Sequence, residues 1–261
     1  MHKPDLDKLV KENRFTISVI FPLVGAIGFL ASAENILPTY LAFSPFMILF
    51  GTLVMRLPLI AGLKPLINKK SGLSIVLLSL YAYFIEYVGL KTGWPYGNFE
   101  YLVELGPMVQ GVPIGLPVFF IPLVVNSYLL VNLFEVDNII KRFLYTLGFI
   151  ILVDLVLDPA AVSLGIWTYA EGFYYGVPVS NFVGWMLSGS IAVLILEYGF
   201  DRSKLVERLN RTDYMLDDMV SFIFLWGLVN LYYGNIVPVG IAFFFATLLY
   251  DTERFDFADF R

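Results

Sequence analysis

Apolar residues occur along the chain in long blocks that short polar joints separate. A helix rises ~1.5 Å per residue, so about 20 apolar residues cross the ~30 Å hydrocarbon layer of a bilayer. Each block therefore predicts a membrane-spanning helix, and residues 1–261 are expected to form one all-α, polytopic membrane domain. The eight predicted spans are residues 15–32, 37–55, 72–90, 114–134, 141–158, 181–199, 216–232 and 235–250.

The boundary between the last two predicted spans is the weakest. Only Tyr233, Gly234 and Asn235 separate them, so these residues must turn the chain tightly. Without that turn the chain has seven spans, which is the alternative.

The basic residues support eight spans and give an orientation. With eight spans, all of the 17 lysines and arginines except Lys91 fall on one side of the membrane. Short cytoplasmic loops carry such an excess, which predicts a multi-pass protein of the cell membrane with both termini in the cytoplasm. The amino end also resembles a secretory signal with a cleavage site at Ala31-Ser32-Ala33, but we expect it to be kept as the first span.

Composition narrows the chemistry. The chain is 58% apolar and 15% charged, has no cysteine, and has His2 as its single histidine. Disulfides, thiolate or histidine metal sites and Ser-His or Cys-His nucleophiles are therefore excluded. The net charge of −5 and the scattered basic residues predict no nucleic-acid partner. We expect a lipid bilayer as solvent, no metal and no cofactor.

Two long outer loops, residues 91–113 and 159–180, share a pattern. Each has a Trp-x-Tyr motif, at Trp94 and at Trp167, followed by further aromatic residues and a Gly-Val-Pro just before the next span. This favours a duplicated helix-loop-helix unit, residues 75–130 and 145–195, with the copies related by an axis along the membrane normal. Interfacial tryptophan and tyrosine and ordinary Gly-Pro turns are the alternative explanation.

Three carboxylates stand inside predicted spans, where a charge at mid-helix costs roughly 2.5–3.5 kcal/mol. Glu86 lies near the outer end of the third span, and Asp154 and Asp158 project from one face of the fifth. Glu86 could simply bond a neighbouring helix, and Asp158, which precedes Pro159, could simply mark the helix end. We expect all three to converge on one pocket and to share a proton.

Carboxylic acids that lack cationic partners and lie among aromatic rings favour acid-catalysed chemistry on an alkene. A neutral carboxylic acid can protonate an alkene, aromatic faces can stabilise the carbocation, and a carboxylate can orient a water molecule for capture. The catalytic candidates are therefore Glu86, Asp154 and Asp158. The candidate substrate-binding residues are Tyr83, Tyr87, Trp94, Tyr96, Asn98, Trp167, Tyr169 and Asn181.

The sequence resembles the membrane carotenoid hydratases, of the bisanhydrobacterioruberin hydratase type, among the carotenoid biosynthesis proteins. The likeness covers about residues 75–200 and rests on the run from Glu86 to Gly97, on Asp158-Pro159 with Gly165-Ile166-Trp167, and on the Gly-Val-Pro-x-x-Asn that ends at Asn181. It implies a cofactor-independent hydro-lyase that adds water to a terminal C=C bond of an acyclic carotenoid and forms a tertiary alcohol. The implied partners are the carotenoid, water and the bilayer, and other membrane enzymes of the carotenoid pathway are further candidate partners.

Two other functions fit parts of the pattern. A carotenoid end-group cyclase, or another isoprenoid-modifying enzyme, also begins by protonating an end alkene, and water access to the site would separate the two. A proton-coupled transporter also uses intramembrane carboxylates in repeated units, but it needs a polar path on both sides of the membrane. The predicted acids cluster in the outer half.

Overall fold

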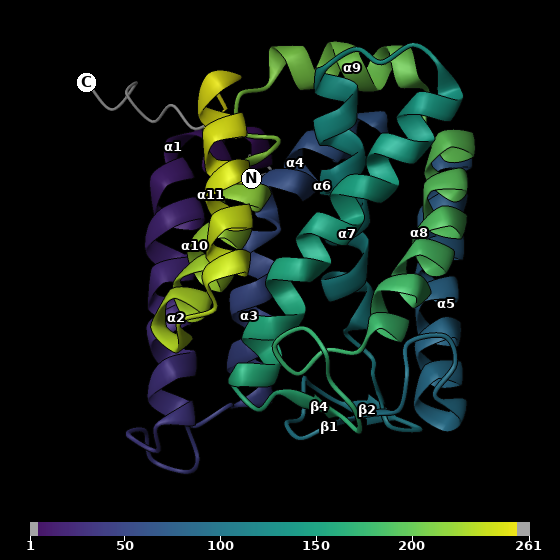
Figure 1. The fold of residues 1–261 in the computed structure, drawn as a ribbon. Helices are drawn as coiled ribbons and strands as arrows, with labels where there is room; N and C mark the ends of the chain where they lie inside the picture. Colours follow the sequence, from purple (N-terminus) through teal and green to yellow (C-terminus); the bar gives the residue numbers. More distant parts are fainter. Residues whose placement is uncertain (1–4, 255–261) are drawn as a thin grey trace.

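The computed structural model describes residues 5–254 and shows a bundle of long helices with two different ends (Figure 1). Helix α9 (Arg202–Arg211) lies across one end, and two loops with the strands β1 (Phe99–Tyr101) and β4 (Trp167–Tyr169) close the other (Figure 1). The first part of the chain forms α1 (Leu6–Glu12), the π-helical turn η1 (Thr16–Ile20), α2 (Phe21–Ala33), α3 (Pro45–Met55), α4 (Leu57–Leu63), the 3-10 turn η2 (Lys64–Leu66) and α5 (Lys69–Thr92).

Local sequence signals set the ends of the long helices that follow. The side chains of Asn68 and Asn138 accept backbone N–H groups in the first turns of α5 and α7. Gly93 ends α5 at a φ of 74°, a left-handed conformation that glycine adopts without steric cost. The second part of the chain forms the strands β2 (Met108–Val109) and β3 (Val112–Pro113) and the helices α6 (Leu116–Leu133), α7 (Ile139–Ser163), α8 (Val179–Gly199), α10 (Asp217–Tyr233) and α11 (Ile236–Asp251).

Every predicted span contains a helix, and the described strands form only two short pairs, both in loops. Four helical segments, Thr16–Ala33, α5, α6 and α8, are long and apolar enough to cross a membrane. The segment from α3 to η2, bent by 45°, makes a fifth if it is one span. Helices α10 and α11 are shorter, with 17 and 16 residues, so the count of eight stays a prediction. Gly234, at a φ of 71°, makes the tight turn expected between α10 and α11.

The second predicted span was wrong in its first part. Residues 37–44 form turns, and helix α3 begins only at Pro45. Ser44 has an extended backbone, with a ψ of 117°, because a residue that precedes proline avoids the helical region. Pro45 then occupies the first helical position, where its missing N–H costs nothing.

The fifth predicted span ended too early, because α7 continues through Pro159 to Ser163. A proline inside a helix leaves the carbonyl four residues before it without its usual N–H partner. In α7 that carbonyl belongs to Leu155, and the hydroxyl of Tyr174, in the loop before α8, donates to it at 3.2 Å. A loop side chain thus replaces the lost backbone bond, so Asp158 lies inside a helix rather than at its end.

Helix α6 contains a second internal proline, Pro122. Here the unpaired carbonyl is that of Val118, and Nε of Arg56 donates to it at 3.2 Å. The same guanidinium donates through Nη1 to the carboxylate of Asp218 at 2.7 Å. Arg56 therefore links the bend after α3 to the middle of the bundle and to the start of α10.

Helix α6 runs through the centre of the molecule. In its most apolar stretch 72% of the residues are buried, against 28% for α5. Helix α5 packs on α8, α6 packs on α7, and α10 packs on both α2 and α11. Tyr128, Leu129 and Leu130 of α6 are almost fully buried in this core.

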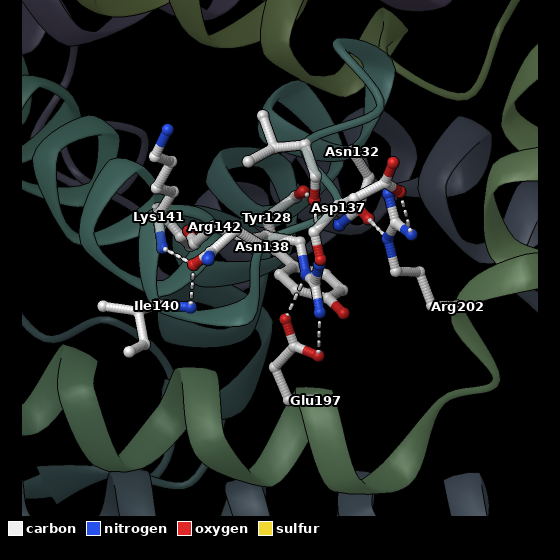
Figure 2. Close-up of polar contacts among 11 residues, drawn as sticks. Tyr128, Asn132, Asp137, Asn138, Ile140, Lys141, Arg142, Glu197 and Arg202 are labelled. Atoms are coloured by element: carbon white, nitrogen blue, oxygen red, sulfur yellow. Dashed lines mark hydrogen bonds and ion pairs between the residues drawn. The ribbon is translucent and has the colours of Figure 1, made fainter.

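A buried ion pair fixes the end of the bundle that α9 covers. Arg142 of α7 donates from Nε and Nη2 to the carboxylate of Glu197 on α8, and from Nη1 to the carbonyls of Val136 and Asp137 (Figure 2). Arg202 at the start of α9 binds the Asp137 carboxylate at 3.0 Å (Figure 2). Since removing one partner of a buried ion pair costs ~3–5 kcal/mol, the Arg142–Glu197 pair holds α7 and α8 together, whereas the exposed pair of Arg202 and Asp137 adds only ~0–1 kcal/mol at α9.

Candidate active site

A cavity of about 460 Å³ extends along the inner side of the bundle up to the paired loops. Its size lies in the range of ~300–1,000 Å³ that is usual for small-molecule sites, and its walls are mostly apolar. The cavity brings together residues that lie far apart in the sequence. Those that were predicted for the site and that line it are Glu86, Tyr96, Asp158, Trp167, Tyr169 and Asn181.

The two loops meet through an antiparallel strand pair. Phe99 lies opposite Tyr169, and Tyr101 lies opposite Trp167. Residues directly opposite each other share a face of the pair, so all four aromatic side chains point the same way and line the cavity. The strand pair thus forms an aromatic floor, with neighbouring ring centres 5.9 to 6.1 Å apart.

The floor holds a carboxylate from each of two helices, and the first is Glu86 of α5. The hydroxyl of Tyr101 donates a hydrogen bond to Oε1 of Glu86. Glu86 lines the cavity and makes no ion pair among the described residues. Its carboxyl group is therefore held at one oxygen by the loop and faces an apolar space.

The second carboxylate, Asp158 of α7, belongs to a larger network. Its Oδ2 accepts hydrogen bonds from the hydroxyl of Tyr169 at 2.8 Å and from Nδ2 of Asn181 at 2.6 Å. The same Nδ2 donates to Oδ2 of Asp154 at 2.9 Å, and Oδ1 of Asn181 accepts from Tyr169 at 3.1 Å. Asp154 and Asp158 are 1% and 3% exposed, so Asn181 joins two buried acids through one amide. Asp154 itself does not line the cavity.

The loop tyrosines act as neutral donors. Burial, followed by the charges of Asp158 and Asp154, raises the pKa of Tyr169 well above its usual value. Burial, followed by the charge of Glu86, raises the pKa of Tyr101 in the same direction. Each phenol therefore keeps its single proton and donates it toward the carboxylates.

Three buried polar atoms at the site have no hydrogen-bond partner within residues 5–254: Nε1 of Trp167, Oδ1 of Asp154 and the hydroxyl of Tyr96. Buried groups of this kind are commonly satisfied by water. In the same part of the chain no three carboxylate or histidine side chains are arranged to hold a metal ion. The cations Arg14, Arg56 and Arg142 pair with Asp217, Asp218 and Glu197 instead of with the three acids of the site.

Four residues predicted for substrate binding lie away from the cavity. The hydroxyl of Tyr83 donates to the carbonyl of Val109 at 2.6 Å, and Tyr87 lies partly exposed beside Lys91. Trp94, in the turn after α5, is 58% exposed. The backbone carbonyl of Asn98 accepts a hydrogen bond from the backbone N–H of Ala170, the residue after β4. Trp94 and Trp167 thus occupy different environments.

The sequence interpretation did not single out Tyr101 or Phe99. A signal for them exists: Phe99-Glu100-Tyr101 has the same aromatic-x-Tyr alternation as Trp167-Thr168-Tyr169, the strand with which it pairs. Trp185 of α8 and Phe120 of α6 were missed as well. They stack 5.1 Å apart in the cavity wall, and the sequence offers no sign of that contact.

Comparisons with known proteins identify the family of the chain. The family model described as carotenoid biosynthesis protein matches residues 43–249. The chain is 56% identical over 255 residues to a bisanhydrobacterioruberin hydratase of Haloarcula japonica, and this similarity covers 96% of the chain and 87% of that protein. No solved structure matches the chain. Because the family model spans more than half of the chain and the relative nearly all of it, this protein belongs to the carotenoid biosynthesis protein family.

Proposed function

We propose that this protein is a membrane hydratase that adds water to a terminal C=C bond of an acyclic carotenoid without a cofactor. The observation that carries the proposal is the convergence of Glu86 and Asp158, from two different helices, on one apolar cavity with an aromatic floor. The name of the Haloarcula japonica relative supports the substrate class and the reaction.

The proposed reaction begins with protonation. The carboxylic acid of Glu86 gives its proton to the terminal alkene, whose electron pair forms the new C–H bond and leaves a tertiary carbocation at the neighbouring carbon. The rings of Phe99, Tyr101 and Trp167 stabilise this cation through their negative faces. Glu86 suits the donor role because one tyrosine holds it at a single oxygen while it faces the cavity.

Water capture completes the reaction. Asp158, which accepts two hydrogen bonds at Oδ2, orients a water molecule and takes one of its protons as the oxygen bonds to the cation. The proton then returns to Glu86, so the net change is the addition of one water. The unpartnered Nε1 of Trp167 supports a bound water in this region. Asp154 acts through Asn181 and positions Asp158.

The direct test is expression in a host that makes acyclic carotenoids, followed by mass analysis of the pigments. We expect a gain of one water mass per reacting end. The Glu86→Gln variant should lose about 10²–10⁴-fold of this conversion, because general acid catalysis contributes that much. Glu100→Gln is the matched control, since Glu100 is exposed on β1 in the same loop and does not line the cavity.

The products also separate the competing reactions. A cyclised end group has the mass of the substrate, so a new pigment of unchanged mass would identify a cyclase. Equal conversion by Glu86→Gln and the wild-type protein, at matched membrane levels, would show that Glu86 is not the proton donor.

The proposed topology has both termini in the cytoplasm and the strand pair on the outer side. It rests on the one-sided distribution of the lysines and arginines. Reporter fusions after residues 65, 138 and 206 should be cytoplasmic, and fusions near residues 104 and 172 should not be. A cytoplasmic signal at residue 104 or 172 would contradict this topology.

A further inference from the structure

Helices α2 and α3 form one long wall of the cavity. The α2 residues in the wall recur at helical spacing, so they occupy one face of the helix, and the α3 residues do the same. The α2 residues are Phe21, Val24, Gly25, Gly28, Phe29 and Ser32, and the α3 residues are Met47, Ile48, Phe50, Gly51, Thr52 and Met55.

This wall is open to the outside of the protein. Val24, Met47 and Phe50 line the cavity, yet they are 63%, 59% and 63% exposed. A side chain can combine both properties only at the rim of an opening. In a membrane such an opening faces lipid, because Val24 and Phe50 lie in the middle of their helices.

Glycines keep the opening wide. A Cβ atom added at Gly28 would meet no atom within 4 Å, and one added at Gly51 would meet only Cε1 of Phe21, at 4.0 Å. Helix α2 packs mainly against α10 rather than against α3. The gap between α2 and α3 is therefore part of the cavity, and the rings of Phe21 and Phe50 meet edge to face across it with their centres 6.4 Å apart.

We propose that the gap between α2 and α3 is a lateral portal through which the polyene of an acyclic carotenoid enters from the bilayer and in which it lies during the reaction. This inference rests on the proposed function, since it assigns the place of the unreactive part of that substrate. The aromatic floor and the carboxylates hold the reacting end, and the portal holds the chain that follows it.

The dimensions of the cavity support this occupant. The wall from Phe21 to Ser32 is about 17 Å long at ~1.5 Å per residue, so it suits a straight, rigid chain that lies along the helices. A cavity of about 460 Å³ has room for a drug-sized part of a ligand rather than for a whole carotenoid. The rest of the polyene must therefore pass through an opening, and the portal between α2 and α3 leads directly into the lipid bilayer, in which the carotenoid dissolves.

The absence of cysteine allows a sharp test, because a single introduced cysteine is then the only thiol. Val24→Cys places it at the rim of the portal. Ile27→Cys is the matched control: Ile27 lies on the same helix and is 66% exposed, close to the 63% of Val24, but it does not line the cavity. Each variant is labelled in membranes with pyrene maleimide, a bulky apolar reagent, and the conversion of an acyclic carotenoid is then measured.

Labelled Val24→Cys should lose about tenfold or more of its conversion, because the reacting end no longer reaches the carboxylates. Labelled Ile27→Cys should keep its conversion. Prior loading of the membranes with the carotenoid should slow labelling at Val24→Cys and leave labelling at Ile27→Cys unchanged. On α3, Phe50→Cys with Phe46→Cys as its control repeats the test, since Phe50 lines the cavity and Phe46, 73% exposed, does not.

Each result separates the portal from the proposed reaction. Full activity of both labelled rim variants would overturn the portal. Equal protection of Val24→Cys in carotenoid-free membranes would overturn the polyene as occupant and identify a lipid acyl chain instead. Carotenoid-dependent protection of Val24→Cys without any gain of water mass in the unlabelled protein would support the portal and overturn the hydratase.

Discussion

The helix-loop-helix units α5-β1-α6 and α7-β4-α8 perform the same task in different ways. Each brings a carboxylate from its first helix to a tyrosine on its strand: Glu86 to Tyr101, and Asp158 to Tyr169. In the first unit a single hydrogen bond does this. In the second, Asn181 ties the carboxylate to a second acid.

If the two units are copies of one another, side-chain length explains the difference. Tyr101 and Tyr169 are 68 residues apart, and so are Glu86 and Asp154. The longer glutamate reaches its tyrosine, whereas Asp154 does not and is bonded to Asn181 instead. Asp158, one turn nearer the loop, takes its place because α7 continues through Pro159. The comparison teaches that one unit presents an acid held by a single hydrogen bond and the other a carboxylate held in a network.

The largest expected difference lies within the second unit. Asp158→Asn should lose about 10²–10⁴-fold of the hydration rate, because it removes the proposed proton acceptor from the cavity. Asp154→Asn should lose only about tenfold, since Asp154 acts through another side chain. Rates per amount of inserted protein measure both effects. Equal losses would mean that the two acids work as one catalytic pair.

Shortening the acid of the first unit should have an intermediate effect. Glu86→Asp keeps the carboxyl group but withdraws it from Tyr101 and from the cavity, so we expect a loss of about tenfold from misplacement. Asp154→Glu is the reciprocal change and should partly restore the activity of Asp158→Asn. If Glu86→Asp has wild-type activity, side-chain length does not distinguish the units.

Removal of the two phenol hydroxyl groups compares the strands directly. Tyr169→Phe removes a hydroxyl that contacts both Asp158 and Asn181 and shares its one proton between them, whereas Tyr101→Phe removes a hydroxyl that contacts Glu86 alone. With a hydrogen bond to a charged group contributing about 1.5–3 kcal/mol, Tyr169→Phe should reduce both stability and rate more than Tyr101→Phe does. Thermal unfolding in detergent and the hydration rate are the measurements. A larger effect of Tyr101→Phe would contradict the assignment of the more connected network to the second unit.

The smallest effect is expected at the two tryptophans with which the sequence motif begins. Trp94→Ala should leave hydration nearly unchanged, because Trp94 is 58% exposed and lies outside the cavity. Trp167→Ala should lower the rate, since it removes part of the aromatic floor. Similar losses at both positions would support equivalent roles for Trp94 and Trp167, as their shared Trp-x-Tyr motif suggests.

The sequence predicted the helices well, because long apolar blocks leave the backbone of a membrane chain little choice other than a helix. The predicted helix ends were wrong where a side chain distant in the sequence determines the backbone conformation. Nothing near Pro159 reveals that Tyr174 will supply the missing hydrogen bond and extend α7. At residues 37–44 the apolar composition predicted a helix, whereas Pro38 and Pro45 indicated correctly that the helix begins later.

Part of the candidate site could also be predicted from the sequence. Costly intramembrane acids stand out in a sequence, and Glu86 and Asp158 both line the cavity. Tyr83 and Tyr87 do not line it. Tyr87 directly follows Glu86, and adjacent residues of a helix point in different directions. Tyr83 is one turn before Glu86, but its hydroxyl donates to the carbonyl of Val109. The duplication of residues 75–130 and 145–195 stays a prediction, which superposition of the two units with Tyr101 on Tyr169 would test.

The register of the strand pair has a consequence for the ancestry of the chain. An antiparallel pair centred on Glu100 and Thr168 is self-complementary, so two copies of one unit could form it across a twofold axis. If the units arose by gene fusion, the ancestor was a homodimer with two identical acids at its interface. Fusion then freed each copy to change alone, and an asymmetric site could evolve from a symmetric one.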